Sequence, residues 1–228
     1  MSKIIVKERE HVTPGEVLAE GMDLIPSEGT YRNGEQIISS IVGLVNLKNN
    51  AIQVNGFKSV YMPRRGDYVI GTVTDMNFSS WFIDVNCPYD ASLPVREASR
   101  EFIDLEKNDM TYYYTYGDVI FAKIIGLTKS KIVTLTMKEQ ETKKLNGGII
   151  MKINSSKIPR LIGTKGSMIS MIKDKTKTQI IIGQNGIVWI KGEPVDTLKA
   201  KNIIEKISNE SHTSGLTEKI EKMLNKGE

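Results

Sequence analysis

The motif with the clearest chemical potential is a pair of glycines in the last third of the chain, within the sequence LIGTKGSMI at residues 161–169. Gly163 and Gly166 have the GxxG spacing. Chance alone gives roughly 1.6 such matches at this length and glycine content, and a second match lies at 183–186, so only the context can distinguish them. The first match is predicted to join two helices, whereas the second lies between two strands and is predicted to be a hairpin turn.

The residues around Gly163 and Gly166 suit the binding of phosphate groups. Glycines let the backbone approach another backbone closely, the helix that follows offers free N–H groups and the positive end of its dipole, and Lys165 adds charge. Nine basic residues and one acid lie between 143 and 177, and the net charge is −3 up to residue 140 and +7 after it. Polyanion binding is therefore predicted for the second half, with a solvated lysine-rich face as the alternative. A Walker A loop is excluded because no GKS or GKT is present.

A second group of candidates lies near the middle of the chain. In the strand predicted at 81–85, Trp81 and Phe82 point to opposite faces, so Trp81 is expected in the core and Phe82 on the surface. Phe78 precedes this strand in a loop, and Lys129 and Lys131 lie in a later loop. Either phenylalanine could stack on nucleic-acid bases or cover a neighbouring domain, and the sequence leaves both open.

Residue types that usually carry catalysis or hold metals are sparse. The chain has two histidines and one cysteine, Cys87, and therefore neither a CxxC pair nor a His–Cys cluster. We predict no catalytic residues, no metal, no cofactor and no enzymatic activity. The N-terminus is charged from Lys3 onward and no apolar run reaches about 18 residues, which predicts neither a signal peptide nor a membrane span and favours a soluble cytoplasmic protein.

Three modules are expected to position these candidates, in a multidomain fold of the β plus α/β class. Frequent turn residues in 1–65 favour a small N-terminal β domain, and five strand-like segments in 66–140 suit an OB-type barrel. Residues 147–210 have the order βααββα, and 211–228 form a tail with a short amphipathic helix. The strands of the first module are expected at 37–38, 41–42, 44–47 and 52–54. Those of the barrel are expected at 67–74, 81–85, 91–93, 118–125 and 132–137, with a short helix at about 96–102.

The last module resembles a KH domain, a fold that binds single-stranded RNA. The resemblance spans about 148–209 and rests on LIGTKGSMI together with the βααββα order. In KH domains the GxxG loop clamps about four backbone nucleotides. The resemblance implies that the loop and its neighbours hold RNA, through Lys157, Arg160, Ile162, Gly163, Thr164, Lys165 and Gly166.

The preceding module resembles an S1-type RNA-binding barrel, from GDYVIGTV at 66–73 to VTLTM at 133–137. The glycine that usually precedes the aromatic residue of the second strand is missing from SSWFIDV at 79–85, although Phe82 keeps the expected position. OB folds bind with the faces of strands 2 and 3 and with the loops after strands 1 and 4. The resemblance implies RNA-binding roles for Phe78, Phe82, Lys129 and Lys131, to which Arg96 and Arg100 are added because they follow the third strand.

The order of the three modules resembles the RNA-binding cap subunit of the archaeal exosome, as do HVTPGEVL at 11–18 and PRRGDYVIG at 63–71. Members of that family are not catalytic. Three copies sit on a hexameric ring of RNase PH-type subunits, on which the N-terminal domain docks, and the barrels surround the opening of the ring. The resemblance implies single-stranded RNA and the ring subunits as partners, and delivery of RNA to 3′-to-5′ degradation or processing.

The alternative is a free-standing S1 and KH regulator of transcription or translation. Such proteins usually carry a second KH unit, which this chain lacks. A third class, an autonomous RNA enzyme, would need a catalytic constellation that the sequence does not contain. An N-terminal module that docks on a ring should present an apolar surface, whereas that of a free regulator should not.

Overall fold

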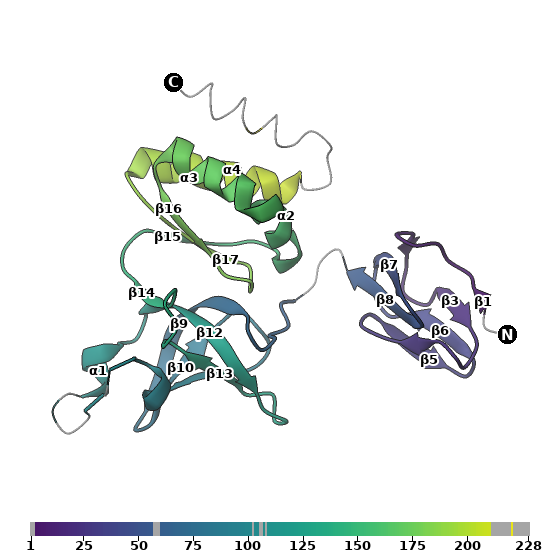
Figure 1. The fold of residues 1–228 in the computed structure, drawn as a ribbon, viewed down its shortest axis with the longest axis horizontal. Coiled ribbons are helices and arrows are strands. Elements are labelled where there is room, and N and C mark those ends of the chain that lie inside the picture. Colours follow the sequence, from purple (N-terminus) through teal and green to yellow (C-terminus); the bar gives the residue numbers. More distant parts are fainter. Residues whose placement is uncertain are drawn as a thin grey trace. The chain divides into compact units, whose positions relative to one another are not determined.

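The computed structural model describes residues 3–56, 60–101, 103, 104, 107, 109–210 and 220. The chain divides into two compact units, Met1–Ser59 and Val60–Glu228 (Figure 1). Each unit has its own apolar core. The second unit contains a β-barrel and an α/β module, so the β plus α/β fold class is confirmed.

The first unit consists of two four-stranded sheets around one core. Leu18, Ile37 and Ile52 are fully buried between them. One sheet has the order β1-β3-β6-β5, from β1 (Lys3–Ile4), β3 (Val17–Glu20), β6 (Gln36–Ser39) and β5 (Thr30–Asn33). The other has the order β2-β7-β8-β4, from β2 (His11–Val12), β7 (Gly43–Lys48), β8 (Ala51–Gly56) and β4 (Ile25–Pro26).

The turn residues decide where these strands end. Asn49 takes a left-handed conformation with a φ of 51° and joins β7 to β8, as the sequence predicted. The strand expected at 41–42 is wrong, because the chain bends there. The Ser39 hydroxyl closes that bend by donating to the Ile41 carbonyl at 2.7 Å, which ends β6.

The barrel of the second unit closes through five strands. Its order is β9-β10-β11-β13-β12, with β12 returning to β9 and β11 parallel to β13. Trp81, Leu93 and Leu135 are fully buried inside it. The strands are β9 (Tyr68–Asn77), β10 (Ser80–Asp84), β11 (Ala91–Pro94), β12 (Val119–Leu127) and β13 (Val133–Thr136), and β14 (Lys143–Leu145) adds to the outer edge of β12.

The connection from β11 to β12 contains less helix than expected. Only one 3-10 turn, η1 (Val95–Glu97), forms where a helix over about 96–102 was predicted, and Phe102 lies outside the described residues. A short helix follows, α1 (Met110–Tyr113), capped by the Asp109 carboxylate. Tyr114 packs edge-on against Trp81 with ring centroids 5.2 Å apart, so this segment covers one end of the barrel.

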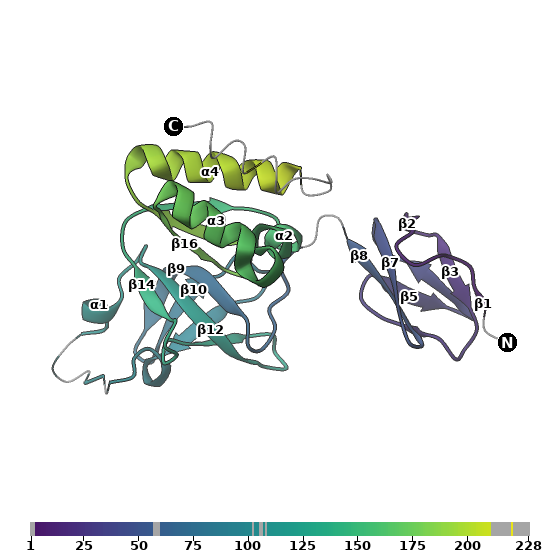
Figure 2. The same ribbon diagram turned by 45° about the horizontal axis from the view of Figure 1, so that its top comes forward.

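The α/β module has the βααββα order that the sequence predicted for residues 147–210. Its sheet has the order β15-β17-β16, from β15 (Ile149–Lys152), β17 (Ile187–Lys191) and β16 (Gln179–Ile182). Three helices lie on one face, α2 (Ile158–Ile162), α3 (Ser167–Thr176) and α4 (Pro194–Asn209), as Figures 1 and 2 show. Leu161, Ile172 and Ile204 fill the layer between helices and sheet. Of the tail, only Ile220 is described, and it is buried in this same core.

The other face of this sheet packs against the barrel. Ile187 and Trp189 contact Ile70 and Phe121 of β9 and β12, together with Leu145 of β14. Trp189 is therefore buried. This apolar layer joins the α/β module and the barrel within one compact unit.

The second GxxG match, between β16 and β17, is the polar part of this junction. Asn185 is fully buried, and its carboxamide donates to the carbonyls of Ile70 and Val85, each at 2.7 Å, and accepts from the Ile70 N–H at 3.3 Å. Next to it, the Gln184 N–H donates to the Tyr68 carbonyl at 2.8 Å. The predicted hairpin turn is confirmed, and in addition its hydrogen bonds join it to the backbone of β9 and of Val85, which follows β10.

Candidate nucleic-acid interface

The loop between α2 and α3 has a backbone that only a glycine-rich sequence can adopt easily. Gly163, Lys165 and Gly166 have φ angles of 74°, 52° and 82°. The Gly163 N–H donates to the Pro159 carbonyl at 3.0 Å and ends α2. Gly166 is the N-cap of α3, so the loop presents the first N–H groups of that helix.

The two glycines of this loop are required for different reasons. A Cβ atom on Gly163 would lie 2.8 Å from the Cβ atom and 2.9 Å from the backbone nitrogen of Met168. A Cβ atom on Gly166 would meet nothing within 4 Å. Gly163 therefore allows the close packing of the loop on α3, whereas Gly166 leaves open space above the loop. A phosphodiester backbone needs such space to come close.

The predicted KH residues gather around this loop. Arg160, Thr164 and Lys165 are exposed, and Lys157 and Ile162 are half-buried. The buried neighbours of these residues, Ile158 and Leu161, fix α2 in the core, so the polar side chains stay on the surface. The arrangement offers backbone N–H groups and cations but no acid within 157–166, which favours an anionic ligand.

The barrel candidates fall into two groups at opposite ends of β11. Because β11 and β13 run parallel with Ala91 opposite Val133, the loop with Lys129 and Lys131 lies beside the start of β11. Phe78 lies beyond the other end, where Ser80 pairs with Pro94. The structure therefore does not bring the two lysines and Phe78 together. Lys131 instead lies over the ring of Tyr89, with its Nζ atom 5.3 Å from the ring centroid.

Phe78 and Phe82 differ in their exposure. Phe78 is 98% exposed in the turn between β9 and β10. Phe82 is half-buried, whereas the alternation of β10 predicted an exposed aromatic. The reason is that β10 is a central strand, so Asp75 and Ser92 flank Phe82 on both sides.

Beside Phe78 the barrel has a cavity of about 830 Å³. Phe78, Arg96 and Arg100 line it, so the structure does bring these three candidates together. Lys138, which follows β13, also lines the cavity but was not among the predicted site residues. No local signal marks Lys138, because its partners are 38 and 41 positions away in the chain.

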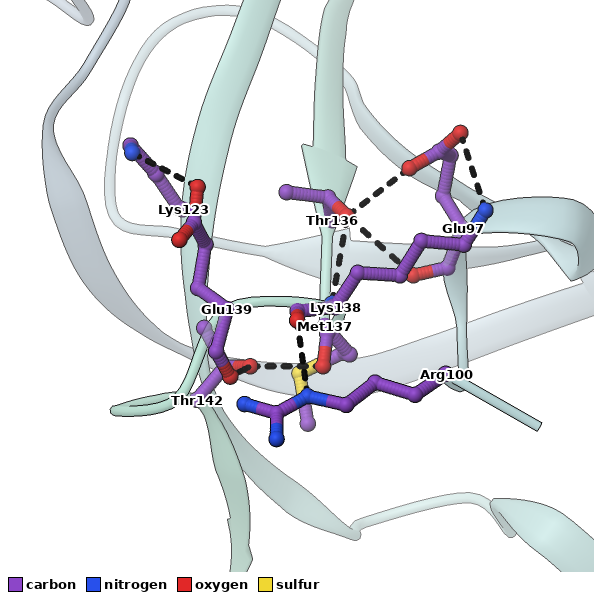
Figure 3. Close-up of polar contacts among 8 residues, drawn as sticks. All are labelled: Glu97, Arg100, Lys123, Thr136, Met137, Lys138, Glu139 and Thr142. Carbon is purple, nitrogen blue, oxygen red and sulfur yellow. Dashed lines mark hydrogen bonds and ion pairs between the residues drawn. The ribbon is translucent and has the colours of Figure 1, made fainter.

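The wall of this cavity is held by a polar network around η1 and the end of β13, shown in Figure 3. The Thr136 hydroxyl donates to the Glu97 carboxylate at 2.8 Å, and Lys138 Nζ lies 3.6 Å from the same carboxylate. Arg100 Nε donates to the Lys138 carbonyl at 2.8 Å. Close by, Lys123 forms an ion pair with Glu139 at 2.7 Å.

Among the described residues, no group of three or more His, Cys, Asp or Glu side chains that could hold a metal ion comes together. Cys87 is half-buried and donates to the Tyr89 carbonyl at 3.1 Å, and burial raises the pKa of its thiol, which disfavours the reactive thiolate. Among the helices described, none is long and apolar enough to cross a membrane.

Three family models match the chain in sequence order. They are the "Exosome complex exonuclease RRP4 N-terminal region" at residues 12–48, the "RRP4, S1 domain" at 60–126 and the "KH domain" at 148–196. The chain is 44% identical to "Exosome complex component Rrp4" of Methanobrevibacter smithii, over 97% of this chain and 72% of the relative. It is 43% identical to the protein of that name from Pyrococcus furiosus, over 98% of this chain and 86% of the relative. A solved structure described as "Crystal structure of putative exosome complex RNA-binding protein" aligns with a TM-score of 0.66 at 31% identity, covering 74% of this chain and 97% of the other.

Proposed function

The chain belongs to the Rrp4 family of exosome complex components, and from this premise we propose that it caps a ring of RNase PH-type subunits, captures single-stranded RNA and passes it to 3′-to-5′ degradation or processing. The chain is an RNA-binding, non-catalytic component of an exosome complex. Capture and delivery, the ring subunits as partners and three copies per complex are the parts we propose.

The observation that carries the RNA-capture step is the loop from Gly163 to Gly166. Its left-handed backbone, the open space at Gly166 and the exposed Lys165 provide a surface for a phosphodiester strand. Lys157, Arg160, Ile162 and Thr164 would complete this contact. Phe78, Phe82, Arg96, Lys129 and Lys131 would guide the strand on the barrel, in two separate places.

We assign docking on the ring to the N-terminal unit. Met22 and Ile25 are 68% and 59% exposed there, and Val42 is exposed as well. Exposed apolar side chains of this size favour a protein partner. The match of residues 12–48 to the Rrp4 N-terminal region supports this role over that of a free-standing regulator.

We further propose that the chain acts in the cytoplasm, and that its modules have the boundaries 1–65, 66–140, 147–210 and 211–228.

Two full-length variants test docking and RNA capture separately. In a tagged pull-down from native lysate, Met22→Glu with Ile25→Glu should lose the ring subunits and the associated 3′-to-5′ activity. The matched control is Val195→Glu with Leu198→Glu, which changes two α4 residues that are 65% and 57% exposed and should keep both. Gly166→Asp should keep the ring subunits but bind RNA more weakly. Recovery of no ring subunits with the unchanged chain would refute the capping role.

A further inference from the structure

The loop that carries Met22 in the N-terminal unit is anchored on both sides. Met22 is 68% exposed, whereas Leu24, two residues further along, is buried in the core of this unit. At the two ends of the loop, the Gly21 N–H and the Ile25 N–H donate to backbone carbonyls of other segments at 2.8 and 2.7 Å. Residues 21–25 therefore form a short, fixed loop with a large apolar side chain on its outer side.

Arg32 of β5 holds the middle of this loop. Its Nη1 atom donates to the Gly21 carbonyl at 3.1 Å, and its Nη2 atom donates to the Leu24 carbonyl. These two carbonyls flank Met22 and Asp23, so one planar guanidinium spans the loop. Both hydrogen bonds are partly buried, which strengthens them. A lysine could supply the charge but not this fork of donors, because its ammonium is a point charge on a flexible stem.

The same guanidinium contacts the side chain of Met22. Arg32 Nη1 lies 3.7 Å from Met22 Sδ. A methionine has three rotatable bonds, so an unrestrained Met22 would lose much conformational freedom when a partner binds. The contact with Arg32 restricts the thioether already in the unbound chain, which lowers the ordering cost of binding.

We propose that Arg32 is a positioning residue for docking on the ring and that it acts through Met22. The guanidinium holds the loop and the thioether in the shape in which Met22 enters an apolar pocket of a ring subunit. This inference rests on the proposed function, because it takes the ring as the partner of the N-terminal unit. Both terminal nitrogens of Arg32 face the loop of their own unit, so the contact that they prepare is apolar and the pocket needs no acid.

The test measures the dissociation constant of the full chain for the assembled ring of RNase PH-type subunits by isothermal titration calorimetry. Arg32→Gln should weaken binding about 2- to 12-fold, the ordering cost of one side chain with many rotamers. Arg32→Lys keeps the charge but not the fork of donors, and it should weaken binding to a similar extent. Normal binding by Arg32→Lys would assign the effect to charge and overturn the proposal.

A double-mutant cycle separates positioning from a general loss of structure. If Arg32 acts through Met22, Arg32→Gln should cause little further loss of affinity in a chain that already carries Met22→Ala, whereas additive losses would overturn the proposal. Amide hydrogen exchange of the Arg32→Gln variant should be faster at 22–24 and unchanged in β6, β7 and β8. If Arg32→Gln alone loses protection in these strands, the cycle uses Arg32→Lys. Loss of protection with both substitutions would make Arg32 a structural residue and overturn the proposal.

Arg9→Gln is the matched control, because Arg9 is an exposed arginine of the same unit. It should bind the ring as the unchanged chain does, and equal weakening by Arg9→Gln would assign the effect to net charge and overturn the proposal. Normal binding by Arg32→Gln, with weak binding by Met22→Ala, would overturn the role of Arg32 and leave docking through the N-terminal unit standing. Normal binding by Met22→Ala would remove Met22 from docking and overturn the proposal as well. No binding by the unchanged chain would overturn both the proposal and the capping role.

Discussion

Substituting the two glycines of the KH loop one at a time should separate folding from RNA binding. At Gly166, alanine needs only a left-handed conformation, at a cost of about 1–2 kcal/mol, because its Cβ atom meets nothing within 4 Å. At Gly163, with φ 74° and ψ 179°, the backbone lies in a region that costs any other residue about 1–3 kcal/mol. The contact at 2.8 Å with Met168 adds about 1–3 kcal/mol of overpacking.

The free energies of unfolding of the Gly163→Ala and Gly166→Ala variants can be compared by fluorescence. Both tryptophans of the chain, Trp81 and Trp189, lie in the second unit, so their emission in a denaturant titration reports on that unit alone. We expect Gly163→Ala to lose about 2–6 kcal/mol and Gly166→Ala about 1–2 kcal/mol. Equal losses, or a larger loss at Gly166, would refute the roles assigned to the two glycines.

The effect of the Gly166 substitutions on RNA affinity should not follow their effect on the free energy of unfolding. Gly166→Ala places a methyl group in the space that we assign to the phosphodiester backbone, so it should weaken binding although the module stays folded. Gly166→Asp should weaken it further, by about fivefold for each phosphate within 4 Å in a water-like environment. Lys199→Ala, an exposed residue of α4, is the control for a general change in charge. Normal affinity of Gly166→Asp, with unchanged folding, would remove this loop from RNA binding.

Three further predictions concern buried polar groups and pH. Asn185→Ala should lower the free energy of unfolding of the second unit by about 2–5 kcal/mol, measured by tryptophan emission, because it leaves two carbonyls and one N–H buried without partners. The Tyr61 hydroxyl donates to Asp67 at 2.6 Å, and burial, followed by this hydrogen bond, raises the pKa of Tyr61. The stability that Tyr61 contributes should therefore be present below the ordinary pKa of tyrosine and be lost as the pH rises above it. Tyr61→Phe should flatten the alkaline part of a curve of unfolding free energy against pH. Burial opposes ionisation of Asp118, but the hydrogen bonds from Lys144 and Thr115 outweigh it, so the pKa of this carboxyl is lowered. The stability that Asp118 contributes should therefore be lost as the pH falls. NMR titration of the Lys144→Met variant should show a higher pKa for Asp118.

Much of the α/β module could be predicted from the sequence because its signals are local. The βααββα order predicted for 147–210 is the order that the structure has, with α3 at Ser167–Thr176 directly after the GxxG loop. The identification as a member of the exosome cap family is confirmed by the relatives and by the matches to Rrp4 domains. The strands β1 to β5 were missed; three of them, β1, β2 and β4, have only two residues, and such strands depend on partners elsewhere in the chain and carry no period of their own.

The parts of the site that escaped prediction depend on long-range contacts. Gly183–Gly186 was predicted only as a turn, because the carbonyls that Asn185 binds lie 100 and 115 positions away. Lys138 was missed as a lining residue of the cavity for the same reason, since its contacts with Glu97 and Arg100 form only when the barrel closes. The exposure of Phe82 was overestimated, because alternation along a strand does not reveal whether the strand is central or at an edge.

The hydrogen bonds between Asn185 and the barrel backbone also have a consequence for how long an RNA must be. Because the turn holds the KH module and the barrel in one compact unit, the distance between the loop at Gly163 and the cavity at Phe78 is set by packing and not by a linker. We propose both places as RNA contacts; for a strand bound at one of them, the second contact would be intramolecular, with an effective concentration that depends on the nucleotides between them. Strands too short to reach both places would bind with the affinity of one contact. Affinity should therefore rise abruptly at one length, and on the proposed function this would favour long single-stranded tails over short products.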